Sequence, residues 1–383
     1  MVNLIMDDQK YMARALYLAQ LGEGRTSPNP MVGAVVVKDG EIIGEGYHQQ
    51  YGGPHAEVFA LEEAGEEAPG AEIYVTLEPC SHYGKTPPCA QKVIDSGIKR
   101  AVVAMVDPNP EVAGRGIKML REAGIEVEVG LFQEEAQVLN ESFLKYIQSN
   151  YPFIYLKKAQ TLDGYIASRS GDSKWITNSK ARLEGHKLRH RVDAIMVGIG
   201  TVLADNPSLT ARLEEKEGLD PLRIILDPLL KIPLDAKIIN QDSKADTLII
   251  TSTDFPPTGA AASFKKKEKL LKKEKVEIIS YENGKDNYFE IKKILKDLHD
   301  REIGSILVEG GAKLSHTFLK EDLVDKFYYF IAPKIYGGSD GIASFCGSGP
   351  KLMSDSVDLK IIKQKNLGDN LFLIAERKRN KQS

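Results

Sequence analysis

The sequence predicts an α/β protein built from two domains, and three observations lead to this expectation. The chain has 383 residues, which is long enough for two or three domains that each bury a core. Apolar runs of strand length alternate with helical patterns along both halves. A helical pattern stops near Ser149, and a strand pattern begins after Pro152. We therefore place one domain at residues 1–149 and a second at residues 150–383.

The first domain is expected to begin with a helix that Asp7 or Asp8 caps, because apolar residues recur at helical spacing from Tyr11 to Ala19. Asp39-Gly40 then favours the left-handed dihedrals of a tight hairpin turn. The remaining patterns predict, in order, strands 31–37 and 41–47, helix 55–64, strand 71–77, a helix after Pro88, strand 100–106, helix 116–123 and strand 125–129. This alternation predicts an α/β/α sandwich.

The second domain is also predicted to be α/β. Its strand patterns lie at residues 153–159, 194–197, 223–226, 247–251, 305–308 and 326–331, with helices between several of them. The lysine-rich run 265–275 is predicted to be a helix with a solvated face. We expect a frayed tail at residues 376–383 and a structural thiol without a catalytic role at Cys346.

Composition narrows the class of protein. The net charge is −3, so no global basic field suggests a nucleic-acid partner. No apolar run approaches the length that spans a bilayer, and three cysteines in the whole chain suit a reducing cytosol. We expect a cytoplasmic enzyme that forms a homo-oligomer and acts on a small molecule, with neither a nucleic-acid nor a membrane partner.

A zinc motif is the strongest chemical signal in the chain. His55, Cys80 and Cys89 are ligand types that zinc prefers, and a catalytic zinc site keeps three protein ligands and one water of lowered pKa. Glu57 lies beside His55 in the sequence and suits general acid/base catalysis. The pattern is typical of nucleobase deaminases, which usually separate the two cysteines by two residues. Here eight residues separate them, which predicts a loop along the pocket before a helix restarts at Pro87-Pro88.

Other interpretations of these residues stay open. Cys80 and Cys89 could form a disulfide if the protein were secreted. A structural zinc site would need a fourth protein ligand and would leave Glu57 without a role. A deaminase that acts on bases within nucleic acid would need a basic surface with stacking aromatics.

Several polar residues are expected near the metal. Asn29 precedes the first strand and could read a pyrimidine ring. Asp107 and Asn109 follow the 100–106 strand and could bind substrate, although their Asp-Pro-Asn-Pro sequence is equally typical of a turn. His82 and Lys85, between the cysteines, suit a phosphate group or are merely solvated.

Two glycine-rich turns follow strands of the second domain, at residues 197–201 and 308–312. Glycine at such a position lets the backbone approach a phosphate at a helix start, or lets a helix pack tightly on a strand. Neither turn matches the G-x-G-x-x-G dinucleotide fingerprint.

The run from Thr76 to Cys89, with its eight-residue spacing, resembles the deaminase domain of the bifunctional riboflavin-biosynthesis deaminase-reductases. The second half is similar to their reductase domain at residues 161–164, 173–177, 201–207 and 308–311. This resemblance implies a zinc cytidine-deaminase-like sandwich followed by a dihydrofolate-reductase-like domain that uses NADPH. It also implies the reaction: deamination of a phosphoribosylated diaminopyrimidinone, followed by reduction of the ribose.

The resemblance further implies site residues in the second domain. Cofactor contacts would fall on Ala159, Trp175, Thr201, Asp205, Gly311, Ala312, Lys313, Leu314, Ser315, His316 and Thr317. Substrate contacts would fall on Ser173, Arg189, Leu209, Arg212 and Glu309. Both arginines suit a ribose phosphate, and Glu309 can accept hydrogen bonds from an amine or hydroxyl. Arg189 could instead belong to a solvated helix face, and Trp175 could be a core aromatic.

Overall fold

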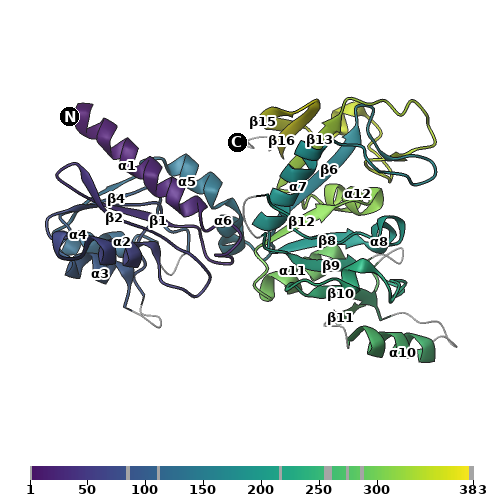
Figure 1. The fold of residues 1–383 in the computed structure, drawn as a ribbon, viewed down its shortest axis with the longest axis horizontal. Helices are drawn as coiled ribbons and strands as arrows, with labels where there is room; N and C mark the ends of the chain where they lie inside the picture. The colour runs from purple at the N-terminus through teal and green to yellow at the C-terminus, as the bar shows by residue number, and fades with distance from the viewer. Residues whose placement is uncertain are drawn as a thin grey trace. The chain divides into compact units, whose positions relative to one another are not determined.

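The computed structural model describes residues 2–82, 87–109, 113–214, 218–253, 261–272, 276–284 and 289–378. The chain folds as two compact units, Met1–Tyr151 and Pro152–Ser383, and Figure 1 shows the elements of each. None of the described helices is long and apolar enough to cross a membrane.

The first unit contains a five-stranded sheet with the order β2-β1-β3-β4-β5. Its strands are β1 (Gly33–Lys38), β2 (Glu41–Tyr47), β3 (Glu72–Val75), β4 (Arg100–Val103) and β5 (Glu126–Val129). β1 is antiparallel to β2 and to β3, whereas β3, β4 and β5 run parallel. The predicted hairpin is confirmed, because Asp39 and Gly40 between β1 and β2 both have positive φ angles, 51° and 85°.

Helices cover both faces of this sheet, which confirms the predicted α/β/α sandwich. They are α1 (Val2–Gln20), α2 (Ala56–Ala64), α3 (Cys89–Asp95), α4 (Arg115–Glu122), α5 (Gln133–Leu139) and α6 (Glu141–Gln148), with a short 3-10 turn, η1 (Gly65–Glu67). α1 and α5 lie on one face, and α2, α3 and α4 lie on the other (Figure 1). α2 lies directly on β2, because a Cβ atom at Gly44 would stand 2.1 Å from the carbonyl oxygen of Ala60. Glycine here sets the position of the helix that begins at the metal motif.

The predicted cap of the first helix is wrong. α1 already begins at Val2, so Asp8 lies inside the helix and is buried. Its carboxylate accepts hydrogen bonds from Arg100 at 3.0 and 2.7 Å and from the hydroxyl of Tyr74. The same guanidinium also pairs with Glu72. Asp8 is therefore part of a buried ion-pair network and does not cap the helix.

Arg100→Met is expected to lower the free energy of unfolding by about 3–5 kcal/mol, because it leaves the buried Asp8 without its counter-charge. Urea denaturation at neutral pH measures this loss. The hydrogen bonds from Arg100 hold the pKa of Asp8 below its usual value. The pair therefore stabilises the fold above the ordinary carboxyl pKa, and this contribution is lost as the pH falls through the lowered pKa.

The difference between wild type and Arg100→Met should consequently shrink in acid. Lys118→Met is the control, since Lys118 forms an exposed pair with Glu122 and should change stability by less than about 1 kcal/mol. An equal loss of stability for Arg100→Met at acidic and neutral pH would contradict the assignment of the ion pair as the cause.

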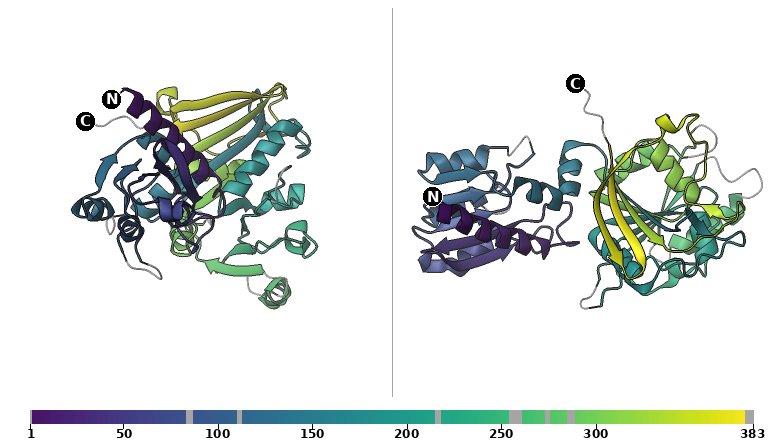
Figure 2. Two further views of the ribbon diagram at one scale, coloured as in Figure 1. Left: turned by 60° about the vertical axis from the view of Figure 1, so that its left-hand side comes forward. Right: turned by 90° about the horizontal axis from the view of Figure 1, so that it is seen from above.

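The second unit contains a nine-stranded sheet with the order β11-β10-β9-β8-β12-β6-β13-β16-β15. Its strands are β6 (Phe153–Thr161), β8 (Ala194–Gly198), β9 (Leu222–Leu226), β10 (Thr247–Ser252), β11 (Val276–Tyr281), β12 (Ser305–Glu309), β13 (Lys326–Ala332), β15 (Leu359–Leu367) and β16 (Asn370–Arg377). β7 (Tyr165–Ala167) and β14 (Ile342–Ala343) form a separate pair. The strands from β11 to β13 are parallel, and β16 and β15 continue antiparallel. The last two strands, yellow in Figure 2, curve along the edge of the sheet.

The helices of this unit are α7 (Ser179–Arg191), α8 (Ile199–Asp205), α9 (Lys237–Asn240), α10 (Ala261–Leu271), α11 (Ile291–Asp300) and α12 (Ala312–Lys320), together with a 3-10 turn, η4 (Met353–Asp355). Each of the six predicted strands is confirmed. The predicted tail begins too early, since Glu376 and Arg377 belong to β16; residues 379–383 lie outside the described part of the chain, so the rest of the tail stays a prediction. Parallel pairing brings the carboxyl ends of β6, β8, β12 and β13 to one edge, where α/β folds usually bind ligands.

Candidate active sites

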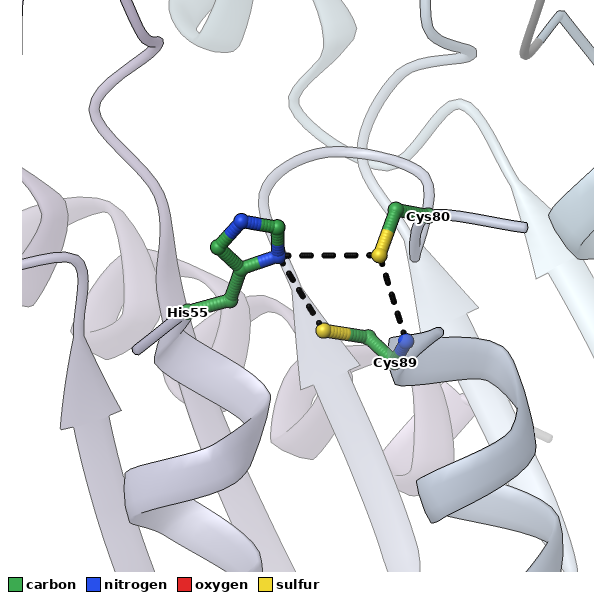
Figure 3. A group of neighbouring side chains, drawn as sticks. All are labelled: His55, Cys80 and Cys89. Atoms are coloured by element: carbon green, nitrogen blue, oxygen red, sulfur yellow. Dashed lines mark hydrogen bonds between the residues drawn. The ribbon is translucent and has the colours of Figure 1, made fainter. Parts of the chain in front are cut away.

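Three ligand-type side chains converge at the edge of the first sheet. His55 caps α2, Cys80 lies in the loop after β3, and Cys89 is the first residue of α3. The Nδ1 atom of His55 lies 3.2 Å from Sγ of Cys89 and 3.6 Å from Sγ of Cys80. The backbone N–H of Cys89 donates to Sγ of Cys80 at 3.2 Å, as Figure 3 shows. The helix restart that the sequence predicts after Pro87-Pro88 is confirmed, and it delivers Cys89 to this group.

The geometry of this group fits one zinc ion. The three ligand atoms lie within 4.8 Å of one another. Tetrahedral zinc with Zn–N and Zn–S bonds of ordinary length places such atoms about 3.5 Å apart. Within the residues that the structure describes, the group has no fourth ligand, which does not support a closed structural site. Cys80 and Cys89 are free cysteines, so the disulfide interpretation is wrong.

The electrostatics of the group favour metal binding. The thiol of Cys89 donates toward Cys80, so the pKa of Cys80 is lowered and that of Cys89 is raised. The same Cys80 thiolate raises the pKa of His55 to about 8. A thiolate that is stabilised before metal arrives is the form of cysteine that binds zinc.

Glu57 occupies the first turn of α2, beside Cys89, and is buried with 3% of its surface exposed. Burial raises the pKa of Glu57 to about 7. Its Oε2 atom is buried and has no hydrogen-bond partner among the described residues. A carboxyl group with a free oxygen next to the metal ligands can take up and release a proton, as a general acid/base must.

Asn29 is linked to the metal group through His48, which the sequence analysis missed. The Nδ2 atom of Asn29 lies 3.3 Å from Nε2 of His48, and Nδ1 of His48 lies 3.0 Å from the carbonyl oxygen of Pro54. The rings of His48 and His55 stand edge to face with centroids 5.6 Å apart. The position of His48 directly after β2 is the signal that could have identified it, since polar residues at strand ends often form sites.

The remaining predicted residues of this site are placed as follows. Asp107 is half-buried and accepts a hydrogen bond from the N–H of Asn109 at 2.9 Å, which confirms the turn. Burial, together with the charge of Glu78, raises the pKa of Asp107 above its usual value. His82 is exposed. Lys85 lies outside the described residues, and substrate binding by any of them stays a prediction.

Glu78 is a second residue that the sequence analysis missed. It is buried, and its carboxylate accepts four backbone hydrogen bonds, from Asp107 at 3.1 Å, Gly114 at 2.9 Å, Gly116 at 2.8 Å and Ile117 at 3.2 Å. Glu78 therefore ties the loop with the cysteines to the loop with Asp107 and to the start of α4.

The second unit has a cavity of about 870 Å³ at the carboxyl ends of its parallel strands. The predicted residues that line it are Ala159, Ser173, Trp175, Arg189, Thr201, Asp205, Leu209, Arg212, Glu309, Gly311, Ala312, Lys313, Leu314 and Thr317. Two predicted cofactor residues do not line it. Ser315 is fully buried and donates to the carbonyl oxygens of Gly310 and Gly311, while His316 packs against Gly347.

A buried ion group forms one wall of the cavity. Arg189 donates to both oxygens of Glu309, at 2.9 and 2.8 Å, and to the carbonyl oxygen of Thr210. Lys157 lies 3.6 Å from Glu309 on the same side. Burial opposes ionisation of Glu309, but Arg189 and Lys157 outweigh it and lower its pKa to about 2. The solvated-face interpretation of Arg189 is wrong, because its guanidinium is held by Glu309.

Arg212 is the more accessible arginine. Its side chain is exposed, and its Nη2 atom lies 3.2 Å from Nε2 of His186. Burial, together with Arg189 and Arg212, lowers the pKa of His186 to about 4. His186 is therefore neutral at physiological pH and can position Arg212 without adding charge.

The two glycine-rich turns also line the cavity. A Cβ atom at Gly310 would lie 3.0 Å from Oγ1 of Thr201, so the turns also pack on each other. Ser173 donates to Asp205 at 3.2 Å. Trp175 is 64% exposed beneath the guanidinium of Arg182, so the core-aromatic interpretation is wrong. Cys346 is exposed and lines the cavity as well.

Two family models match the chain. The cytidine and deoxycytidylate deaminase zinc-binding region matches residues 5–105, and the RibD C-terminal domain matches residues 152–373. The folds and sites thus define a bifunctional enzyme, in which a zinc-dependent deaminase domain precedes a dihydrofolate-reductase-like reductase domain. This class replaces the alternatives of a structural zinc protein and of a nucleic-acid deaminase.

Individual relatives cover nearly the whole chain. The riboflavin biosynthesis protein RibD of Aquifex aeolicus is 46% identical to this chain, and the aligned region covers 97% of this chain and 98% of that protein. The structure of Acinetobacter baumannii RibD matches with a TM-score of 0.84 at 38% sequence identity, and the match covers 98% of this chain and 99% of that one. A structure from Thermotoga maritima matches with a TM-score of 0.83 at 39% sequence identity, and the match covers 97% of this chain and 99% of that one. That protein is named diaminohydroxyphosphoribosylaminopyrimidine deaminase/5-amino-6-(5-phosphoribosylamino)uracil reductase. The chain belongs to the RibD family of riboflavin biosynthesis enzymes.

Proposed function

We propose that the first domain deaminates 2,5-diamino-6-(5-phosphoribosylamino)pyrimidin-4(3H)-one to 5-amino-6-(5-phosphoribosylamino)uracil. The second domain then reduces the ribose with NADPH to give 5-amino-6-(5-phosphoribitylamino)uracil. The observation that carries this proposal is the pairing, in one chain, of the His55, Cys80 and Cys89 group with a cavity that Arg212 and Glu309 line. The name of the Thermotoga relative supports the choice of substrates.

In the deaminase domain, His55, Cys80 and Cys89 are the residues that would hold one zinc ion. When bound, the ion would supply a water of lowered pKa. Glu57 moves the protons, because its free oxygen takes one up and delivers it to the C2 amine, which leaves as ammonia. Asn29 is positioned by His48 to contact the pyrimidine ring.

In the reductase domain, the turn after β12 and the residues around Thr201 would hold the dinucleotide. NADPH, when bound, would supply the hydride that reduces C1′ of the opened imine form of the sugar, and solvent water would supply the proton that the nitrogen takes. Arg212 binds the ribose phosphate, whereas Arg189 holds Glu309 in its place. Glu309 still has lone pairs to accept a hydrogen bond from a sugar hydroxyl.

Mass spectrometry of the products tests this proposal. The zinc-loaded protein is incubated with the phosphoribosylated diaminopyrimidinone, with and without NADPH. We expect the deaminated ring alone without NADPH, and the deaminated ring with a reduced sugar when NADPH is present. Unchanged substrate in both samples would refute the proposal. A cytoplasmic location and a homo-oligomeric state stay predictions of the sequence.

Glu78→Gln is expected to raise the KM of the deaminase by about tenfold. The neutral amide accepts fewer hydrogen bonds than the carboxylate, and each hydrogen bond to a charged group contributes about 1.5–3 kcal/mol of stability. Asp107 and the start of α4 then lose their common anchor. Zinc content and reductase activity should not change. The control is Glu122→Gln, an exposed residue of α4. Equal deaminase KM values for the two variants would contradict the positioning role.

A further inference from the structure

Lys158 of β6 is a buried cation in an unusual setting. Only 2% of its surface is exposed, although it borders the cavity. Its Nζ atom lies 3.5 Å from the carbonyl oxygen of Gly310 and 5.1 Å from the ring centre of Phe345. Within the described residues, no carboxylate forms an ion pair with it. Buried lysines normally have such a partner, because an unpaired buried charge is costly.

Neighbouring lysines of the same sheet are paired. Lys157 points to the opposite face, as adjacent strand residues do, and faces Glu309 at 3.6 Å. Lys326 of β13 lies 3.5 Å from Glu376. Burial and the charge of Lys157 lower the pKa of Lys158 to about 7. Among these three buried or half-buried lysines, Lys158 is the one whose counter-charge is missing.

The contact with Gly310 places Lys158 directly behind the turn that starts α12. Gly310 and Gly311 have positive φ angles of 71° and 49°. Ser315 donates to both of their carbonyl oxygens, at 3.2 and 3.0 Å, so Lys158 and Ser315 hold the same carbonyl group of Gly310. Gly311 and Ala312 line the cavity. The start of a helix attracts anions through its free N–H groups.

We propose that Lys158 is a positioning residue of the dinucleotide site. Its ammonium group fixes the Gly310 carbonyl behind the turn, and it supplies the positive charge that a phosphate of an anionic dinucleotide meets at the start of α12. This inference rests on the proposed use of NADPH. It gives the unpaired charge a function, since the counter-charge arrives with the cofactor.

Equilibrium titration with NADPH tests the inference, with the zinc-loaded full-length wild type and its variants. Lys158→Met keeps the length and apolar stem but removes the charge, and we expect the Kd for NADPH to rise about tenfold or more. Without ligand, its melting temperature should equal or exceed that of the wild type, because an unpaired buried charge is gone. Lys158→Arg should bind NADPH more tightly than Lys158→Met.

Lys326→Met is the matched control. It removes a buried lysine that has a partner, so it should lower the ligand-free melting temperature and keep the Kd for NADPH. An unchanged Kd for Lys158→Met would overturn the inference, as would a raised Kd that accompanies a fall in ligand-free melting temperature. Absence of NADPH binding by the wild type would overturn the proposed function instead, and this inference with it.

Discussion

Glu57→Gln is expected to lower the deaminase turnover number by about 10²–10⁴-fold, the usual contribution of a general acid/base. Glutamine fits the same buried volume but carries no proton that it can exchange. The reductase activity of the same chain should stay at the wild-type level, because it depends on a separate cavity. Ammonia release at saturating substrate measures the first activity, and NADPH oxidation with the deaminated intermediate measures the second.

Two controls make the result specific to proton transfer. Zinc content should stay at one ion per chain, since Glu57 is not among the three ligand side chains. Glu62→Gln changes an exposed glutamate of the same helix that pairs with Lys92, and it should leave turnover unaffected. Wild-type turnover in a zinc-loaded Glu57→Gln protein would exclude Glu57 as the proton carrier.

The metal group could be predicted from sequence because each ligand lies at the start of a local element. His55 and Cys89 stand at helix starts, and the two cysteines are separated by one loop. Local spacing and residue chemistry were therefore sufficient to name them. Glu78 was missed because its role exists only in the folded chain, where it meets amides 29 to 39 positions away. No local pattern encodes such a contact.

Local sequence patterns also failed to predict some strands of the second sheet, among them β15 and β16. Central strands such as β8 and β12 are buried on both faces and read as continuous apolar runs. β15 is an edge strand, and its adjacent residues Ile361 and Ile362 are 56% and 48% exposed. It shows neither an apolar run nor an alternation of buried and exposed positions. Pairing with β16, and not local hydrophobicity, makes it a strand.

The resemblance to the deaminase-reductase family identified residues of the reductase cavity whose roles depend on partners far away in the sequence. Arg189 and Glu309 are 120 positions apart and form a bidentate pair. From the sequence alone, a solvated helix face stayed open as an alternative for Arg189. The fold determines the role of Arg189. Parallel pairing of β6 with β12 brings Lys157 beside Glu309, and α7 places Arg189 against the same carboxylate.

Glu309→Gln is expected to have the largest effect on the second domain. It removes the shared counter-charge of two half-buried cations, Arg189 and Lys157, and breaking a largely buried ion pair in this way costs about 3–5 kcal/mol of stability. Reductase activity should fall by about 10²-fold or more, the equivalent of losing one buried charged contact to substrate. Urea denaturation and NADPH oxidation measure the two losses, and the deaminase serves as the internal reference.

The control for surface charge is Glu321→Gln, since Glu321 is exposed and pairs with the exposed Lys292. It should change stability and reductase activity little. A Glu309→Gln protein as stable and as active as this control would contradict the assignment of the ion group.

A double variant separates the structural role of Glu309 from its role in substrate binding. Arg189→Met combined with Glu309→Gln removes both members of the bidentate pair, so stability should recover toward wild type because fewer buried charges lack partners. Reductase activity should not recover, since the acceptor for the sugar hydroxyl is still missing. Strictly additive losses of stability would mean that the two residues do not act as a pair.

Because the pKa of Glu309 is held at about 2, its carboxylate stabilises the fold above the usual carboxyl pKa and loses this effect only as the pH falls through about 2. Any titration in the neutral pH profile of the reductase must then come from another group.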